Sequence, residues 1–295
     1  MQEGADIIAL SFVRSADDFA DVKRIMDEEE VHVPVIAKIE KPQAVERLVE
    51  IVQAFDGIMV ARGDLGVEMP LEAVPLVQKR AIELARRYAK PVIVATQVFD
   101  SMIHNPRPTR AEASDCANAI LDGADAVMLS GETSVGAYPI DAVRLMASVI
   151  TNVEENGGDR IAPLTTYDHD RAGVLSIAAA RAAEMLDLKF MIAFTQGGTT
   201  ARTMSRLRSP IPMVAFTPLE ATRNQLAVSW GIHTYRVPYV THTDDMVWQV
   251  DQVLQAQGLA KRGDQVIILG GMPPGVPGST NSMRIHTVGM ETDYR

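Results

Sequence analysis

A lysine and two acidic residues stand where chemistry on a phosphate or an enolate is possible. Lys38 and Glu40 lie two residues apart at the end of the apolar stretch VIAKIE, so both side chains point to the same face of an extended strand. Asp64 lies in the segment ARGDLG, whose glycines let a ligand approach the backbone closely. Two carboxylates suit a magnesium ion that completes its octahedron with water and ligand oxygens. A lysine beside that ion can neutralise charge on a transferring phosphoryl group or an enolate.

Each of these three residues also has a purely structural interpretation. A lysine at a strand end can extend its stem to the rim of the sheet and leave its charge in water. Glu40 can serve as a simple ion-pair partner of Lys38, and Asp64 can cap a helix after a turn. One residue at a time, the sequence leaves these alternatives open.

The shared position of several polar residues, each directly after an apolar segment, favours a functional site over separate structural roles. Polar or unusual residues directly follow five apolar segments, and in a parallel barrel such strand ends share one face. The sets are Ser11 and Phe12, Lys38 and Glu40, Arg62 and Asp64, Thr96 and Gln97, and Ser130 and Glu132. We therefore expect all five sets to meet at the mouth of the barrel, the open end at which the carboxyl ends of the strands lie.

The five apolar segments that precede these residues are typical of strands buried on both faces. They are continuous Val/Ile runs, spaced about 23 to 35 residues apart, with helical stretches between them. This spacing predicts a repeated β/α unit, in a barrel or a doubly wound sheet. The predicted strands are residues 6–10, 34–39, 57–61, 91–95 and 126–129.

Two of the intervening helices have clear ends. Thr109 and Glu112 form a capping-box pattern that opens a helix ending near Gly123, and a second helix is predicted over residues 140–155. Cys116, the single cysteine, falls inside the first of these helices among small and apolar residues. We interpret it as a small buried residue, and one cysteine excludes an intrachain disulfide.

A second, smaller α/β domain is predicted after a linker. Residues 156–170 are rich in Gly, Pro and polar side chains, which separates a first domain, 1–155, from a second, 171–295. The predicted strands of the second domain are 190–195, 213–216, 232–237, 266–269 and 284–288, and its predicted helices are 172–186, 202–207 and 221–229.

Composition excludes several classes of partner. The chain has 28 Lys and Arg against 38 Asp and Glu, a net charge of −10, whereas non-specific nucleic-acid binding needs a positive surface. No apolar run approaches the roughly 20 residues of a membrane span. The N-terminus has no basic region followed by an apolar stretch. We therefore expect a cytoplasmic protein that binds neither nucleic acid nor a membrane.

Six segments in unbroken order resemble pyruvate kinase. They are IAKIEKPQA, DGIMVARGDLGVEMP, PLVQKRA, KPVIVATQ, SMIHNPRPTRAEASD and DGADAVMLSGETSVGAYP, and the second domain is similar to that family's C-terminal regulatory domain. The resemblance implies transfer of the phosphoryl group of phosphoenolpyruvate to ADP, giving pyruvate and ATP, with Mg²⁺ (or Mn²⁺) and usually K⁺. It also implies a homotetramer, since family members usually are.

The resemblance also implies roles for individual residues. Lys38 would stabilise the phosphoryl group and the enolate, while Glu40 and Asp64 would hold the divalent metal. The backbone amides of Gly63 and Asp64 and the hydroxyl of Thr96 would contact the substrate carboxylate. The proton that reaches the enolate would travel by a route that includes the hydroxyls of Thr96 and Ser130. Two further residues would line the same pocket, Phe12 and Arg62.

A candidate effector site lies in the second domain. Residues Thr195, Gln196, Gly197, Gly198, Thr199 and Thr200 follow a predicted strand and open a helix, a geometry that suits a phosphate. In pyruvate kinases the loop at this place grips the phosphate of an activator, and a second loop, here residues 270–281, faces it. Neither 196–200 nor 270–281 contains a cation, so we expect a monophosphate rather than a bisphosphate. The alternative is an ordinary strand-to-helix turn.

The family barrel begins with three strands and an inserted lid that would precede these segments. The resemblance therefore implies a partial TIM-type (β/α) barrel with the last five strands, most of the K⁺ site outside this chain, and no turnover from this chain alone. Two other interpretations stay open: a non-catalytic metabolite-binding or regulatory chain derived from pyruvate kinase, and another barrel enzyme acting on enolates or oxo acids. The six ordered segments disfavour the second of these.

Overall fold

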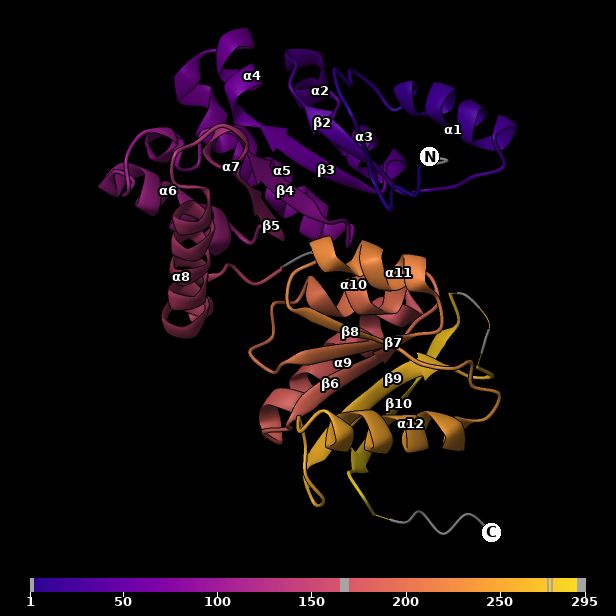
Figure 1. The fold of residues 1–295 in the computed structure, drawn as a ribbon. Helices are drawn as coiled ribbons and strands as arrows, with labels where there is room; N and C mark the ends of the chain where they lie inside the picture. Colours follow the sequence, from indigo (N-terminus) through magenta and orange to yellow (C-terminus); the bar gives the residue numbers. More distant parts are fainter. Residues whose placement is uncertain (1–2, 165–169, 275, 277, 291–295) are drawn as a thin grey trace. The chain divides into compact units, whose positions relative to one another are not determined.

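The computed structural model describes residues 3–164, 170–274, 276 and 278–290, and the chain divides into two compact units (Figure 1). Unit 1 comprises residues 1–165 and unit 2 residues 166–295. Helix α8 (Pro139–Gly157) continues into the first residues of the predicted linker. Residues 165–169 of that linker lie outside the described residues.

Unit 1 is built on a sheet of five parallel strands in sequence order. The strands are β1 (Ile8–Leu10), β2 (Val35–Ile39), β3 (Gly57–Ala61), β4 (Val92–Ala95) and β5 (Ala126–Met128). Each strand pairs with the next along the chain, so all five carboxyl ends lie at one edge of the sheet. Over the described residues the sheet stays open, with β1 and β5 at its two edges. The predicted five-stranded part of a barrel is confirmed.

Helices connect these strands and follow the last of them. They are α1 (Asp18–Glu28), α2 (Pro42–Glu46), α3 (Leu48–Ala54), α4 (Arg62–Glu68), α5 (Val74–Arg87), α6 (Arg110–Asp122) and α7 (Gly131–Ser134), followed by α8. All five residues of β3 are buried, as continuous apolar strands predict for a parallel sheet. The main core contains Ile51, Ile58 and Ile82, together with Phe55, whose ring meets Phe19 edge to face. This packing fixes the strand ends that carry the candidate site.

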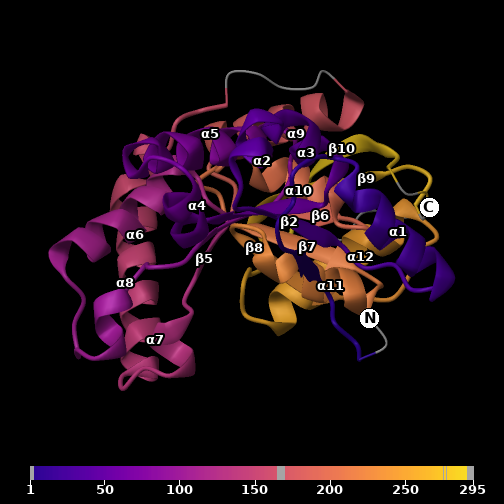
Figure 2. The ribbon, with the colours of Figure 1, turned by 90° about the horizontal axis from the view of Figure 1, so that it is seen from above.

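The ends of α6 are as predicted. Thr109 Oγ1 accepts a hydrogen bond from the Glu112 amide, and Glu112 Oε2 accepts one from the Thr109 amide at 2.7 Å. The helix stops at Gly123, whose φ of 99° lies in the left-handed region that favours glycine. The α6 and α8 helices lie side by side (Figures 1 and 2), and Cys116 packs between them against Ala142. Burial raises the pKa of the Cys116 thiol to about 11, so it stays protonated and structural, as predicted.

Unit 2 contains a second five-stranded sheet in the order β10-β9-β6-β7-β8. Its strands are β6 (Phe190–Phe194), β7 (Met213–Thr217), β8 (Ile232–Arg236), β9 (Gln265–Gly271) and β10 (Thr280–Thr287). All pairs are parallel except β10 on β9. From β6 the chain continues to β7 and β8 on one side of it, and β9 then pairs with the other side of β6. The strand order therefore reverses at β6, and such a reversal, a topological switch point, leaves a crevice at the carboxyl end of the strands.

Helices cover both faces of this sheet. Residues of α9 (Arg171–Met185) and α10 (Thr199–Ser205) pack on one face, and α12 (Thr243–Ala256) packs on the other. A further short helix, α11 (Glu220–Gln225), precedes β8. Helix α12 was not predicted from the sequence, because polar Gln and Asp residues interrupt its apolar face. No helix among the described residues is long and apolar enough to cross a membrane.

Candidate functional site

Lys38 and Glu40 form an ion pair at the carboxyl end of β2. Lys38 Nζ lies 2.5 Å from Glu40 Oε1 and donates to Ser11 Oγ at 3.1 Å. The Glu40 side chain is 2% exposed, and its second oxygen accepts a hydrogen bond from the Phe12 amide at 2.7 Å. The structure thus brings together the predicted residues that follow β1 and β2. The prediction that Glu40 pairs with Lys38 is confirmed, and the pair lies at the carboxyl end of β2.

Phe12 projects from the same corner with its ring exposed to solvent. Its φ of 59° is left-handed, which is unusual for a bulky residue, and the Glu40 carboxylate holds its amide in that conformation. Lys41 lies over the ring, 5.4 Å from its centroid, and pairs with Glu68 of α4 at 2.6 Å. An exposed aromatic ring held at a strand end is available to a ligand in this mouth.

Asp64 lies in the first turn of α4, directly after β3, and is exposed. Its carboxylate makes no hydrogen bond or ion pair with the other described residues. No group of three or more His, Cys, Asp or Glu side chains that could hold a metal occurs in the described part of the chain. The donor set of Glu40 and Asp64 fits Mg²⁺, which usually takes only one or two carboxylates and completes its shell with water and substrate oxygens.

The β4 strand ends in two consecutive left-handed residues, Thr96 (φ 69°) and Gln97 (φ 52°). Thr96 Oγ1 accepts a hydrogen bond from the Gly63 amide at 2.7 Å and donates one to Ala95 O at 2.7 Å. Two residues predicted to contact the substrate carboxylate, Gly63 and Thr96, are therefore in direct contact with each other. A ligand that uses both groups must replace this hydrogen bond.

Both terminal nitrogens of Arg62 bind other groups of the protein. Nη2 donates to Thr96 O at 2.8 Å and to Gln97 O at 3.4 Å, while Nη1 pairs with Asp115 of α6 and lies 3.5 Å from Gln78 Oε1. Arg62 was predicted from the sequence to line the pocket, whereas Asp115 was not predicted to take part. The one local signal is a lone carboxylate in the small-residue run SDCANA, next to Cys116.

Glu132 connects the loops after β4 and β5. Its side chain is 2% exposed, and it accepts hydrogen bonds from the Phe99 amide at 3.0 Å and the Ser130 amide at 2.8 Å. The backbone of Ser130, predicted to help carry a proton, is held by this carboxylate, and its own side chain is exposed. Sequence analysis placed Glu132 at the mouth but gave it no role.

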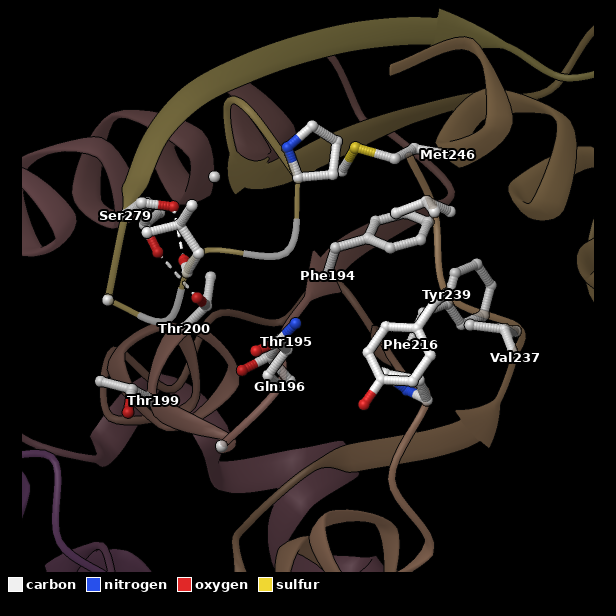
Figure 3. A pocket seen from close by; sticks show the side chains of 18 of the residues that line it. Phe194, Thr195, Gln196, Thr199, Thr200, Phe216, Val237, Tyr239, Met246 and Ser279 are labelled. Atoms are coloured by element: carbon white, nitrogen blue, oxygen red, sulfur yellow. Dashed lines mark hydrogen bonds between the residues drawn. The ribbon is translucent and has the colours of Figure 1, made fainter. Parts of the chain in front are cut away.

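Unit 2 has a cavity of about 120 Å³ at the switch point between β6 and β9 (Figure 3). Hydroxyl-bearing residues, among them Thr199, Thr200 and Ser279, gather at one side, and aromatic rings form the other. The lining residues are Phe194, Thr195, Gln196, Gly197, Thr199, Thr200, Phe216, Pro218, Val237, Pro238, Tyr239, Val240, Met246, Gly271, Pro274, Val276, Gly278, Ser279 and Thr280. None of these described lining residues is charged.

The predicted effector loop is well organised. Thr195 Oγ1 accepts from the Gly198 amide at 2.9 Å, and the φ of Gly198, 84°, is left-handed. The Thr200 hydroxyl hydrogen-bonds that of Thr280 on β10 at 2.7 Å, which ties the loop after β6 to the loop after β9. The two loops predicted to face each other therefore line one cavity.

Comparison with known proteins assigns both units. A family model for the pyruvate kinase barrel domain matches residues 1–143, and one for the pyruvate kinase alpha/beta domain matches residues 174–286. The chain belongs to the pyruvate kinase family. It is 58% identical to a pyruvate kinase of Mycobacterium intracellulare over 97% of this chain and 60% of the relative. It is 55% identical to that of Corynebacterium glutamicum over 98% of this chain and 60% of the relative.

A more distant relative gives the same picture. The pyruvate kinase of Geobacillus stearothermophilus is 42% identical over 98% of this chain and 50% of its own length. The chain thus spans about 60% of the length of the Mycobacterium and Corynebacterium relatives. The resemblance stated from six sequence segments is confirmed.

Proposed function

We propose that the protein catalyses phosphoryl transfer from phosphoenolpyruvate to ADP, giving pyruvate and ATP, the last step of glycolysis. The observation that carries the proposal is the Lys38–Glu40 pair, 2.5 Å apart at the carboxyl end of β2, in a chain of this family. The Lys38 side chain is 25% exposed, while the Glu40 side chain paired with it is 2% exposed. A cation in that position can stabilise negative charge as it develops on a transferring group.

The other residues of the mouth have separate tasks in this proposal. Glu40 and Asp64 would hold Mg²⁺, which supplies charge neutralisation of phosphate oxygens when it is bound. The Gly63 and Asp64 amides and the Thr96 hydroxyl would bind the carboxylate of the substrate, and Phe12 would cover one side of it. Thr96 and Ser130 follow β4 and β5 in the chain, and their hydroxyls would relay a proton to the enolate.

Metal binding is testable without turnover. Asp64→Asn and Glu40→Gln each remove one anionic oxygen and keep the shape of the side chain, so each is expected to weaken Mn²⁺ binding. Titration followed by electron paramagnetic resonance measures the free Mn²⁺ directly. Asp100→Asn, in the 3₁₀ turn after β4, is a control of the same chemistry and is expected to bind Mn²⁺ as the unmodified protein does. Unchanged affinity in both site variants would show that neither carboxylate binds the metal.

We also propose K⁺ dependence, a homotetramer and a cytoplasmic location, all on the strength of family membership. We expect sedimentation equilibrium of the protein, expressed from its complete gene, to give a particle mass four times that of one chain. A monomer at micromolar concentration would contradict the tetramer.

The competing proposal, a regulatory chain without turnover, predicts that phosphoenolpyruvate and Mn²⁺ bind but no pyruvate forms.

We propose that the unit 2 cavity binds a phosphorylated allosteric effector with a single phosphate. The Thr199 and Thr200 hydroxyls and the amides of Gly197, Thr199 and Thr200 offer hydrogen-bond donors on one side. The absence of charged residues among the described lining leaves nothing to neutralise a second phosphate. The aromatic rings Phe194, Phe216 and Tyr239 offer apolar area to the rest of the effector.

Calorimetric titration distinguishes the two classes of effector. A sugar or nucleoside monophosphate is expected to bind more tightly than fructose bisphosphate, and Thr199→Val, which removes a hydroxyl at constant shape, is expected to weaken that binding. Thr133→Val, in α7 of unit 1, is the matched control. Tighter binding of the bisphosphate would show that a cation from elsewhere reaches the cavity.

A further inference from the structure

The corner after β4 is held in an unfavourable backbone conformation. Thr96 and Gln97 both have positive φ, at 69° and 52°, and neither is a glycine. L-residues adopt this region at a cost, so two in succession persist only where surrounding contacts impose them. Thr96 carries the hydroxyl that the proposed function assigns to substrate binding and proton transfer. Whatever holds this corner therefore sets the position of that hydroxyl.

The Arg62 guanidinium holds the corner from one side. Its Nη2 donates to the carbonyl oxygens of both strained residues, Thr96 at 2.8 Å and Gln97 at 3.4 Å. Both carbonyls reach this one donor in the left-handed conformation of the corner, so the guanidinium stabilises that conformation. The Arg62 side chain is 12% exposed, so water competes weakly for these bonds. The backbone of the same segment contributes as well, since the next residue, Gly63, donates its amide to Thr96 Oγ1.

Asp115 holds the guanidinium in turn. It lies on α6, 53 positions away in the sequence, and pairs with Nη1, the nitrogen that does not reach the corner. Beyond the corner, Glu132 holds the Phe99 amide at 3.0 Å. The strained pair is thus fixed between an Asp115–Arg62 contact and a Glu132 contact. Loss of the first is expected to free residues 96 and 97 while residues from Phe99 onward stay anchored.

We propose that Asp115 is a positioning residue: through Arg62 it keeps the Thr96–Gln97 corner left-handed and so places the Thr96 hydroxyl. Its link to phosphoryl transfer rests on the proposed function, but its effect on the corner does not. Arg62 then acts as a fixed strut whose terminal nitrogens serve protein carbonyls and a carboxylate rather than a substrate phosphate. Removal of the carboxylate leaves the guanidinium charge without its partner, and it turns toward solvent.

Hydrogen exchange tests the effect on the corner directly, in the protein as its gene encodes it. Asp115→Asn keeps the shape and removes the charge, so the peptide covering residues 94–99 is expected to exchange on the order of tenfold faster. Asp141→Asn removes a carboxylate from the neighbouring helix α8, where it lies 3.9 Å from Arg144, and is expected to leave that peptide unchanged. Arg62→Lys retains a positive charge but has one nitrogen for all these partners, so it is expected to act as Asp115→Asn does.

Kinetics test the link to Thr96. Asp115→Asn is expected to lower kcat roughly 10- to 100-fold, the size of effect that misplacement of a reacting group causes. In a Thr96→Ala background the same change is expected to have little further effect, because the group that Asp115 positions is gone. Effects that multiply, or exchange at 94–99 unchanged in both Asp115→Asn and Arg62→Lys, would overturn the proposal. If the unmodified protein makes no pyruvate, the proposed function fails, and the exchange data still decide whether Asp115 holds the corner.

Discussion

Lys38→Met is expected to lower kcat by at least about 10² to 10³-fold, because it removes the cation that stabilises charge on the transferring group and the enolate. The fold should survive, since Lys38 Nζ lies outside the apolar core and the buried Glu40 carboxylate, which loses its cation, keeps the Phe12 amide as a donor. Methionine keeps most of the length of the stem. Steady-state kinetics with phosphoenolpyruvate and ADP measure the loss, and far-UV circular dichroism checks the fold.

Lys79→Met provides the matched control for this variant. Lys79 also forms an ion pair in unit 1, with Asp122, but it lies on α5, away from the strand ends. Its replacement is expected to leave turnover unchanged. Activity of Lys38→Met within tenfold of the unmodified protein would refute the assigned role of Lys38.

The second large effect concerns residues 1–295 expressed on their own, which are expected to show no pyruvate kinase turnover. Lys38, Glu40, Asp64 and Thr96 are all in place, so the loss would not come from these groups. In unit 1 the described sheet is open, with β1 and β5 as edges that a closed barrel would pair. The matched region covers only 60% of the length of the Mycobacterium intracellulare relative. Correct positioning of two substrates contributes as much as roughly 7–11 kcal/mol to lowering the barrier in well-oriented systems. An open site is expected to lose much of that contribution.

A coupled assay on the purified chain measures this, with phosphoenolpyruvate, ADP, Mg²⁺ and K⁺ all supplied. Binding of a monophosphate by the same preparation serves as its internal control, because unit 2 has its own sheet and core. Turnover near the range usual for kinases, about 1–100 per second, would show that the five described strands of unit 1 suffice.

Most strands were predictable from the sequence because buried parallel strands leave a strong local pattern. The run GIMVA gave the bounds of β3 without error, and VIAKI predicted β2 to within one residue. The two-residue spacing of Lys38 and Glu40 likewise placed both side chains on one face, where they form an ion pair. The capping box before α6 was legible because it lies within four consecutive residues.

Contacts between distant segments left no such pattern. Arg62 meets Asp115 across 53 positions, and Glu132 meets Phe99 across 33, so the residues next to each one in the sequence do not identify its partner. The left-handed backbone of Thr96 and Gln97 was equally hidden, since both residues are ordinary in strands and turns. Sequence pattern therefore located the mouth, and the network that holds its shape emerged only from the structure.

Simultaneous measurement of pyruvate and ATP tests the central claim most directly. The protein encoded by its gene is mixed with phosphoenolpyruvate, ADP, K⁺ and Mg²⁺, and both products are followed, with Lys38→Met in parallel. The account predicts pyruvate and ATP in equal amounts, no product when Mg²⁺ is chelated, and a loss of both products in Lys38→Met. Pyruvate without ATP, or full activity in Lys38→Met, would contradict phosphoryl transfer at the Lys38–Glu40 site.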